Sequence, residues 1–494
     1  MEDVLKDLEL LIRSRYSLIV LETNEEERAE QVLGSLASRL AIPHFTWSRT
    51  KGLRRADLPN EIYKTQDPSL ALSHIESSGI PALYHLRDFA PFLQDAALTA
   101  KLKDAALQLV NRKGAIVVSG HGLELPETLR SLATTARLPR PTVGDYATLL
   151  QRTVRDLAAR SSVEVKISKQ DTEALLANLK GLTLEEASRI LTKAIIEDGC
   201  LTRDDVAHVI AAKKAVIERE GILEYFPADE GMADIAGLEG LKRWLAKRRA
   251  IIADAKRAAE FGLEFPRGVL LLGVPGCGKS LSAKAIAREW SLPLLRLDPG
   301  KLYDKYIGES ERNFRRAITV AERMSPLVLW IDEIEKAFAA GGEGDGGTSL
   351  RILGSFLSWL QERRGDVFVV ATANDVTRLP PELLRKGRFD EIFFVDLPTP
   401  GERCAIFGIH LRKRNQRAES FNLPALAAAT DGFSGAEIEQ VIVSALYSAF
   451  SANTPLATAH LLAEISLTKP LSVTMGERFD AMREWAREKT VAAN

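Results

Sequence analysis

The feature that most constrains the fold of this chain is a glycine-rich segment, GVPGCGKS, at residues 273–280. The apolar run Gly268–Leu272 precedes it, and the amphipathic run Leu281–Trp290 follows it. A loop of this composition between a strand and a helix lets backbone N–H groups approach phosphate oxygens, with a lysine on the phosphates and a hydroxyl on Mg²⁺. The segment therefore predicts a strand–loop–helix unit that binds a nucleoside triphosphate through Lys279 and Ser280.

A second motif further along the chain supports the same chemistry. Residues 327–333 read LVLWIDE, an apolar run that ends in two carboxylates. This pattern is typical of a buried parallel strand that delivers Asp332 toward the metal and Glu333 toward a water. A tight glycine turn without a ligand is the structural alternative, and the two motifs together disfavour it. The chain is therefore predicted to bind ATP or GTP with Mg²⁺.

Composition limits the class of protein further. The 494 residues allow about three domains, and 66 basic against 67 acidic side chains give no electrostatic preference for nucleic acid. The three cysteines are dispersed without metal-ligand spacing, which suits a reducing compartment. The first residues lack the basic start of a secretory signal, and no apolar run is long enough to span a bilayer. We therefore expect a soluble cytoplasmic protein.

The second half of the chain alternates apolar runs with amphipathic segments, which predicts a parallel α/β sheet. Further buried strands are expected at residues 293–298 and 367–375. The segments GVPGCGKS, KYIGESE, IDE, ATAND, RKGRFD and GFSGAE follow one another in this order. In that order they resemble the AAA ATPase family, in its clade with a second arginine motif, over about residues 232–465. The resemblance implies ATP and Mg²⁺ as cofactors and a helical lid over the nucleotide.

The resemblance also implies roles for individual residues. Asp332 would hold Mg²⁺ together with the Ser280 hydroxyl, Glu333 would polarise the attacking water, and Asn374 would hydrogen-bond the γ-phosphate or that water. Arg385 and Arg388 resemble the arginine fingers that a subunit inserts into its neighbour's site. A cation supplied in this way stabilises transition-state charge, so hydrolysis would depend on assembly.

Other positions of the resemblance would contact the nucleotide. The backbone of residues 235–237 would flank adenine, the glycine-rich loop would hold the phosphates, and residues 410 and 435–436 would contact the nucleotide from the lid. The full set is Ile235, Ala236, Gly237, Val274, Pro275, Gly276, Cys277, Gly278, Lys279, Ser280, Leu281, His410, Gly435 and Ala436.

Several of these residues also have a purely structural interpretation. Asn374 suits the cap of the next turn, and Arg385 and Arg388 suit a basic surface turn. His410 suits a partly buried helix position. Cys277 occupies a variable loop position, where its thiol is expected to be incidental rather than catalytic.

Residues 305–308, KYIG, resemble the loop that lines the axial channel of AAA rings. Tyr306 and Ile307 would grip extended polypeptide there, because a rigid aromatic contacts many side-chain types and a glycine lets the loop move. Alternatively, Tyr306 packs on its own domain or on a neighbouring subunit and grips nothing.

Residues 1–222 lack a Gly-Lys-Ser loop but repeat the strand–helix rhythm of the second half. Residues 16–40 predict a strand, a turn and a helix, with the acidic TNEEER in the place of a phosphate loop, and Arg87 and Asp88 replace the paired acids. We interpret this half as a degenerate AAA-like module that does not bind ATP, since its acids would repel a triphosphate. Two unrelated α/β segments with a generic period are the alternative. The predicted parts are a degenerate AAA-like α/β module (1–143), a helical subdomain (144–222), an AAA ATPase large subdomain (223–400), and a helical lid with the C-terminal tail (401–494).

Over its full length the chain resembles the uncharacterised AAA proteins known from chloroplast reading frames, cyanobacteria and other bacteria. The leading hypothesis is an oligomeric, hexameric ATPase that remodels a protein partner. A nucleotide-regulated ring scaffold that moves little substrate is the first alternative. A nucleic-acid motor is a weaker alternative, because the charge is balanced and no aromatic–basic cluster is present.

Overall fold

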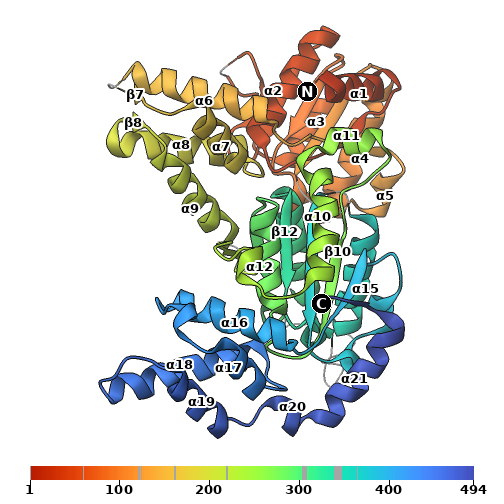
Figure 1. Ribbon diagram of the computed structural model, residues 1–494. Coiled ribbons are helices and arrows are strands. Elements are labelled where there is room, and N and C mark those ends of the chain that lie inside the picture. The colour runs from red at the N-terminus through yellow and green to blue at the C-terminus, as the bar shows by residue number, and fades with distance from the viewer. Residues whose placement is uncertain are drawn as a thin grey trace. The chain divides into compact units, whose positions relative to one another are not determined.

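The computed structural model describes residues 2–58, 60–120, 123, 125–160, 163–218, 221–302, 309–338, 348–363 and 365–494. The chain divides into two compact units, Met1–Val209 and Ile210–Asn494. The division falls inside one helix, α9 (Asp204–Glu218), whereas the sequence placed a boundary after residue 222. Both units contain a predominantly parallel sheet with helices packed against it, as Figure 1 shows.

The sheet of the first unit has the strand order β3-β2-β4-β5-β1-β6, in which only β3 runs antiparallel to its neighbour. Alternate strand residues face opposite layers, because successive side chains of a strand point to opposite faces. One layer contains α1 and α2, and the other contains α3 and α4. The elements are β1 (Leu18–Glu22), β2 (His44–Ser48), β3 (Gly52–Arg55), β4 (Leu83–Leu86), β5 (Ala115–Gly120), β6 (Ala133–Arg137), α1 (Glu2–Arg13), α2 (Glu26–Leu40), α3 (Pro68–Ser77), α4 (Ala96–Val110) and α5 (Glu127–Arg130).

A helical part follows the first sheet. Three of its helices begin at side-chain caps, and the hydroxyl of the buried Tyr146 donates a hydrogen bond of 2.6 Å to the carbonyl of Leu182, in the turn between two later helices. The elements are α6 (Val143–Ala158), β7 (Glu164–Val165), α7 (Lys169–Leu179), α8 (Leu184–Asp198) and β8 (Cys200–Leu201), followed by α9.

The sheet of the second unit has the order β15-β14-β10-β13-β12-β11-β9, and only β9 runs antiparallel to its neighbour. Its central strands are continuous buried apolar runs, as parallel strands covered on both faces require. Helices α10 and α12 share one core with alternate residues of these strands. The elements are β9 (Leu223–Phe226), α10 (Glu239–Ala253), α11 (Ala255–Glu260), β10 (Gly268–Gly273), α12 (Lys279–Glu289), β11 (Leu294–Leu297), α13 (Glu309–Arg323), β12 (Leu327–Ile331), α14 (Ile334–Phe338), α15 (Thr348–Glu362), β13 (Val367–Ala373) and β14 (Glu391–Val395).

Five strands of each sheet share one topology. The order β2-β4-β5-β1-β6 corresponds strand by strand to β11-β12-β13-β10-β14, and each sheet has an antiparallel strand at the same edge. These edge strands differ in connectivity, because β3 follows β2 in the chain whereas β9 precedes β10. The backbone after the equivalent strands β4 and β12 is also alike. Asp88 and Glu333 are each the second residue after their strand, and both have a positive φ, 51° and 49°. The internal repeat inferred from the sequence is therefore present in the fold.

Helices at the end of the chain form the lid and then return to the sheet. α16 (Pro400–Lys413), α17 (Leu423–Ala429), α18 (Gly435–Ser451) and α19 (Thr458–Leu467) enclose a small apolar core of their own. α20 (Leu471–Thr474) and α21 (Gly476–Lys489) then lead to β15 (Val491–Ala492), which pairs with β14. The sequence assigned this last stretch to a tail, and the structure makes part of it a strand of the sheet.

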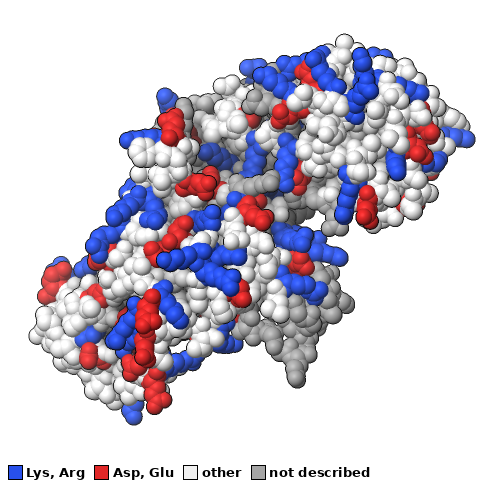
Figure 2. Space-filling view, turned by 90° about the vertical axis from the view of Figure 1, so that its right-hand side faces the viewer, with Lys and Arg blue, Asp and Glu red and all other residues white. Residues whose placement is uncertain are grey.

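Charges of both signs are mixed on the surface. On the face that Figure 2 shows, acidic side chains lie among the lysine and arginine side chains. Of the helices in the described part of the chain, none has the length and apolar character needed to cross a membrane.

Candidate functional site

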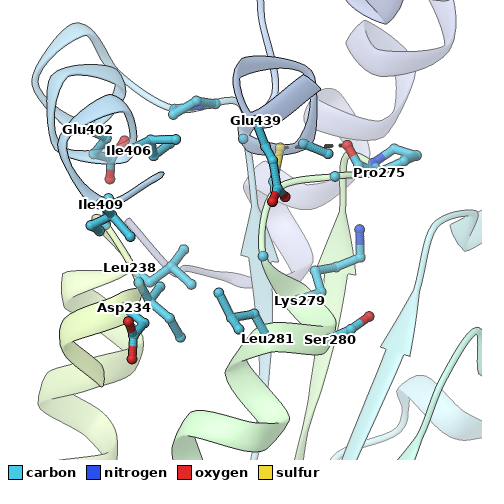
Figure 3. A pocket seen from close by; sticks show the side chains of 18 of the residues that line it. Asp234, Leu238, Pro275, Lys279, Ser280, Leu281, Glu402, Ile406, Ile409 and Glu439 are labelled. Carbon is cyan, nitrogen blue, oxygen red and sulfur yellow. Dashed lines mark hydrogen bonds between the residues drawn. The ribbon is translucent and has the colours of Figure 1, made fainter. Parts of the chain in front are cut away.

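A cavity of about 580 Å³ lies at the carboxyl ends of the central strands of the second unit. Its volume falls within the range of about 300–1,000 Å³ that is usual for small-ligand sites. The glycine-rich loop, the ends of β12 to β14, and the lid helices α16 and α18 contribute its walls. Figure 3 shows Leu238, Glu402, Ile406 and Ile409 on one side of the cavity, and Lys279 and Ser280 on the other.

The glycine-rich loop depends on glycine at two positions. Gly276 and Gly278 have φ values of 77° and 88°, in the left-handed region that other residues rarely adopt. At Gly276 a Cβ atom would also lie 2.9 Å from the Cβ of Ala436, and the Ala436 N–H donates a 3.0 Å hydrogen bond to the Gly276 carbonyl. The loop is thus held against the first turn of lid helix α18.

Lys279 is buried, with 5% of its surface exposed, and points back along the loop. Its Nζ donates hydrogen bonds of 2.8 Å to the carbonyls of Gly273 and Val274. Burial lowers the pKa of Lys279 to about 8. A negatively charged ligand here would favour the charged form, so the site is electrostatically incomplete without an anion. Burial also raises the pKa of the Cys277 thiol to about 12, which makes this loop cysteine a poor nucleophile.

A chain of hydrogen bonds joins the loop to the ends of two strands. The Ser280 hydroxyl donates to Asp332 Oδ1 at 2.9 Å, and the Thr372 hydroxyl donates to the same oxygen at 2.6 Å. Thr372 Oγ1 also accepts the Glu333 N–H at 3.0 Å, and Asn374 Nδ2 donates to Glu333 Oε1 at 3.0 Å. The five residues, which come from three separate segments of the chain, therefore form one polar network at the phosphate end of the cavity.

The residues at this end fit Mg²⁺. Two ligands at adjacent corners of an octahedron with bonds of 2.0–2.1 Å lie about 2.9 Å apart, and this is the distance between Ser280 Oγ and Asp332 Oδ1. In the described part of the chain, no group of three or more His, Cys, Asp or Glu side chains is placed to hold a metal. The remaining ligands would be phosphate oxygens and water, as is usual for Mg²⁺.

A buried carboxylate that the sequence analysis did not single out supports the network from behind. Glu335 is 3% exposed, its Oε1 accepts the backbone N–H of Asn374 at 3.0 Å, and burial raises its pKa. Lys336 pairs with the outer oxygen of Glu333. The backbone of Asn374 and the carboxylate of Glu333 are thereby oriented by groups outside the cavity.

The opposite end of the cavity is largely apolar. Ile235, Ala236, Leu238, Ile406 and Ile409 line it, which suits the faces of a planar base.

Two pairs of ionisable side chains border this apolar end. His410 lies there with its Nδ1 3.5 Å from Glu439 Oε1; burial lowers its pKa, and Glu439 opposes the shift. Lys413 also lines this end, and its Nζ lies 3.6 Å from Asp234 Oδ1 in an ion pair.

The structure brings most of the predicted site residues together. Those that line the cavity are Ile235, Ala236, Pro275, Gly276, Cys277, Gly278, Lys279, Ser280, Leu281, Asp332, Glu333, Asn374, His410, Gly435 and Ala436. Their roles stay predictions.

Other predicted residues lie outside the cavity. Val274 contributes its carbonyl to Lys279 rather than a cavity wall, and Gly237 lies behind Glu402. Arg385 is exposed, and Arg388 donates to the Leu357 carbonyl. The expected channel-loop residues 306 and 307 (Tyr306 and Ile307) fall outside the described residues.

Several cavity residues were missed by sequence reasoning. Thr372 could have been noticed, because it stands two residues before Asn374 at the end of the same predicted strand. Asp396, Glu402 and Asn494 carried no comparable signal; Asp396 directly follows β14, whereas Glu402 and Asn494 reach the cavity through the folding of the lid and of the end of the chain.

The corresponding position in the first unit has its charges reversed. Arg87 stands at the end of β4, where β12 is followed by Asp332, and it pairs with Glu30 at 2.9 Å and with Glu26 at 3.6 Å on α2. Ser119, at the position of Thr372, donates to Glu26 at 2.8 Å and contacts Nε2 of the buried His85 at 2.8 Å. Carboxylates thus occupy the helix N-terminus where a phosphate would bind. This arrangement supports the prediction that the first unit does not bind ATP.

Models of known protein families match four successive parts of the chain. The family described as "SpoVK-like AAA ATPase, N-terminal domain" matches residues 4–138, and "SpoVK-like AAA ATPase, second domain" matches residues 146–220. "ATPase family associated with various cellular activities (AAA)" matches residues 269–397, and "AAA+ lid domain" matches residues 420–461. These matches confirm the expected α/β fold, in which an AAA-like module and a helical part precede an AAA core with its lid.

Some similar proteins align with nearly the full chain, and others with somewhat less than half of it. The "Uncharacterized AAA domain-containing protein ycf46" of Pyropia yezoensis is 37% identical over 486 residues, which are 97% of this chain and 97% of that protein. The protein of the same name from Trieres chinensis is 38% identical over 97% of this chain and 96% of its own length. The "Proteasome-activating nucleotidase" of Aeropyrum pernix is 37% identical over 44% of this chain and 54% of its own length.

Proposed function

As the chain belongs to the AAA ATPase family, together with the ycf46 proteins that match 97% of its length, we propose that it is a Mg²⁺-dependent ATPase that works as an oligomeric ring, a hexamer, on a protein partner. The observation that carries the proposal is the hydrogen-bonded network from Ser280 to Asn374 at the mouth of the glycine-rich loop. This network joins a metal-binding pair to a carboxylate oriented for a water.

The residues divide the work of hydrolysis. Lys279 leaves the loop carbonyls and binds the phosphates, while the loop amides and the start of α12 hold their oxygens. Ser280 and Asp332 hold Mg²⁺, which neutralises charge on the phosphates when bound. Glu333 orients the attacking water and takes a proton from that water. Asn374 Nδ2 holds the Glu333 carboxylate, and the Thr372 hydroxyl holds the Glu333 backbone N–H. The apolar end binds the base.

The arginine fingers would come from a neighbouring subunit. Among the described residues that line the cavity there is no arginine, and Lys279 and Lys413 are the cations present. Arg385 is exposed on the turn before β14, where a neighbour could receive it. Because a trans arginine stabilises the charge of the transition state, we propose that Arg385 and Arg388 make turnover depend on assembly.

A mixing experiment tests the shared site. Arg388→Ala and Lys279→Ala should each abolish hydrolysis, and the first should still bind nucleotide. When the two variants are mixed, some interfaces combine an intact loop with an intact finger, so part of the phosphate release should return. Arg378→Ala, an exposed arginine of the same subdomain, is the matched control and should turn over normally. Full activity of Arg388→Ala, or of a dilute monomer, would contradict the proposal.

A substitution in the expected channel loop distinguishes the remodelling ATPase from the scaffold alternative. If the ring moves polypeptide, Tyr306→Ala should keep ATPase activity but lose work on the partner. A scaffold should tolerate the change. Glu333→Gln should bind ATP without turnover and retain the assembled state, so partners can be co-purified on it; unchanged turnover would remove Glu333 from the chemistry.

A further inference from the structure

The end of the chain returns to the nucleotide cavity. We call residues 470–494 the returning segment; it comprises α20, α21 and β15. β15 pairs in parallel with β14, and the fully buried Ala493 donates its N–H to the Phe394 carbonyl at 2.9 Å. The Ala493 carbonyl accepts the Leu241 N–H at 3.2 Å, and a Cβ on Gly240 would lie 2.6 Å from the Ala492 carbonyl. The segment is therefore built into the core of the AAA sheet.

Two arginines of α21 hold the strand ends that flank the loop strand β10. Arg483 grips Asp396, which follows β14 and lines the cavity, with Nε at 2.9 Å from Oδ2 and Nη2 at 2.8 Å from Oδ1. Such two-pronged contacts fix orientation as well as distance. Arg478 pairs with Asp375, the residue directly after Asn374. One helix thus bridges the carboxyl ends of β13 and β14.

Two further contacts reach the lid. The Leu471 N–H donates to Glu437 Oε1 at 2.8 Å, and Glu437 caps α18 by accepting the Ser434 N–H at 2.7 Å. This cap orders the turn that touches the glycine-rich loop. At the far end of the segment, Asn494 lines the cavity and donates to Glu402 Oε2 at 3.2 Å. Each of the four contacts therefore ends on a cavity residue or on a residue adjacent to one in sequence or structure.

We propose that the returning segment is part of the nucleotide site, with Arg483 and Arg478 as positioning residues that hold the strand ends and the lid in the geometry that binds nucleotide. The inference rests on the proposed function, since it concerns the same cavity. Coupling between two sites is reciprocal. If docking of the segment strengthens nucleotide binding, bound nucleotide strengthens docking of the segment by the same factor.

The test uses the full chain and an ADP analogue with a fluorescent label. Arg483→Ala should weaken binding of the analogue about 5- to 20-fold, within the usual range of coupling between sites. Arg483→Lys, which keeps the charge but loses the two-pronged contact, should lie between that variant and wild type. Arg487→Ala on the same helix is the matched control, because Arg487 is exposed, and it should bind as wild type does.

Hydrogen exchange supplies a readout that a merely structural role would not move. In the wild type, ADP should slow exchange of amides in Gly476–Lys489 and Val491–Ala493, and in Lys279→Ala the same ADP concentration should not. The inference is overturned if the wild type binds ADP while exchange in the segment is unchanged and Arg483→Ala binds within about twofold of it. If Arg483→Ala does not fold, the hydrogen-exchange result for the wild type and the affinity of Arg483→Lys for the analogue test the inference instead. Absence of ADP binding by the wild type would instead overturn the proposed function itself.

Discussion

Replacing Thr372 with valine probes the polar network at its centre. Thr372 is 2% exposed, and its hydroxyl serves two partners that the proposal assigns to catalysis: it donates to Asp332 Oδ1 at 2.6 Å and accepts the Glu333 N–H at 3.0 Å. Valine has nearly the same shape but cannot donate or accept, so the change removes both contacts and leaves the packing in place.

The expected magnitude follows from these two contacts. A hydrogen bond to a charged group contributes about 1.5–3 kcal/mol, and a buried N–H left without a partner costs about 1–3 kcal/mol. The added methyl group returns about 1 kcal/mol through burial, so Thr372→Val should lower the free energy of unfolding by about 1.5–5 kcal/mol. Misplacement of Asp332 and Glu333 should lower kcat about 100-fold, which corresponds to about 2.7 kcal/mol. Nucleotide affinity should change less than about threefold, because the loop and Lys279 are untouched.

The measurement separates kcat from binding. Phosphate release gives kcat, titration with a fluorescent nucleotide gives Kd, and urea unfolding gives stability. Thr372→Ser is the control, because it keeps the hydroxyl and loses only a methyl group. A Thr372→Val protein with wild-type kcat would refute the reasoning. Equal losses in both variants would show that any change at this position lowers kcat, and would not support a specific role of the hydroxyl.

Three further outcomes follow from the site. Burial lowers the pKa of Lys279 to about 8, and a bound phosphate favours the charged form. Nucleotide binding should therefore take up a proton above pH 8, and the affinity should fall by up to about tenfold per pH unit there. Calorimetric titration from pH 7 to 9.5 measures the Kd and the proton uptake, and a constant Kd would contradict the prediction. Cys277 and Cys200 are both partly exposed, but the pKa of Cys277 is raised to about 12, so Cys277 should react with iodoacetamide at least about tenfold more slowly than Cys200, as followed by mass spectrometry; equal rates would contradict the raised pKa. In Gly237→Ala the new Cβ, at φ 69°, would lie 1.8 Å from Glu402 Oε1, so stability in urea should fall by about 1–3 kcal/mol; adding Glu402→Ala should restore part of the loss, and strictly additive effects would exclude the clash.

The sequence predicted the elements of the second unit closely, and its errors have local causes. The loop strand was expected at residues 268–272 and is Gly268–Gly273, and the following helix was expected from residue 281 but begins at Lys279. The helix starts earlier because Gly278 takes the left-handed conformation at its N-cap, which periodicity of apolar residues does not report. The strand before Asn374 ends at Ala373, within two residues of the expectation.

The first unit shows how far a pattern without a motif can be interpreted. Its strand–helix rhythm indicated a second AAA-like module, and the matching strand orders of the two sheets confirm it. The sequence also located Arg87 where the metal carboxylate would stand. The pairing of Arg87 with Glu26 and Glu30 was not predictable, because one partner lies at the end of a strand and the others on a helix far away in sequence.

By itself, the sequence determined the phosphate loop, the acidic strand end and their strand–helix setting, because phosphate binding requires neighbouring residues in a fixed local order. Tertiary structure alone decided that Thr372 links the Asp332 carboxylate to the backbone N–H of Glu333, that Glu335 fixes the backbone of Asn374, and that the returning segment joins the sheet. These contacts join residues far apart in the chain. Their geometry depends on strand order and on helix packing, which a local pattern of residues does not encode.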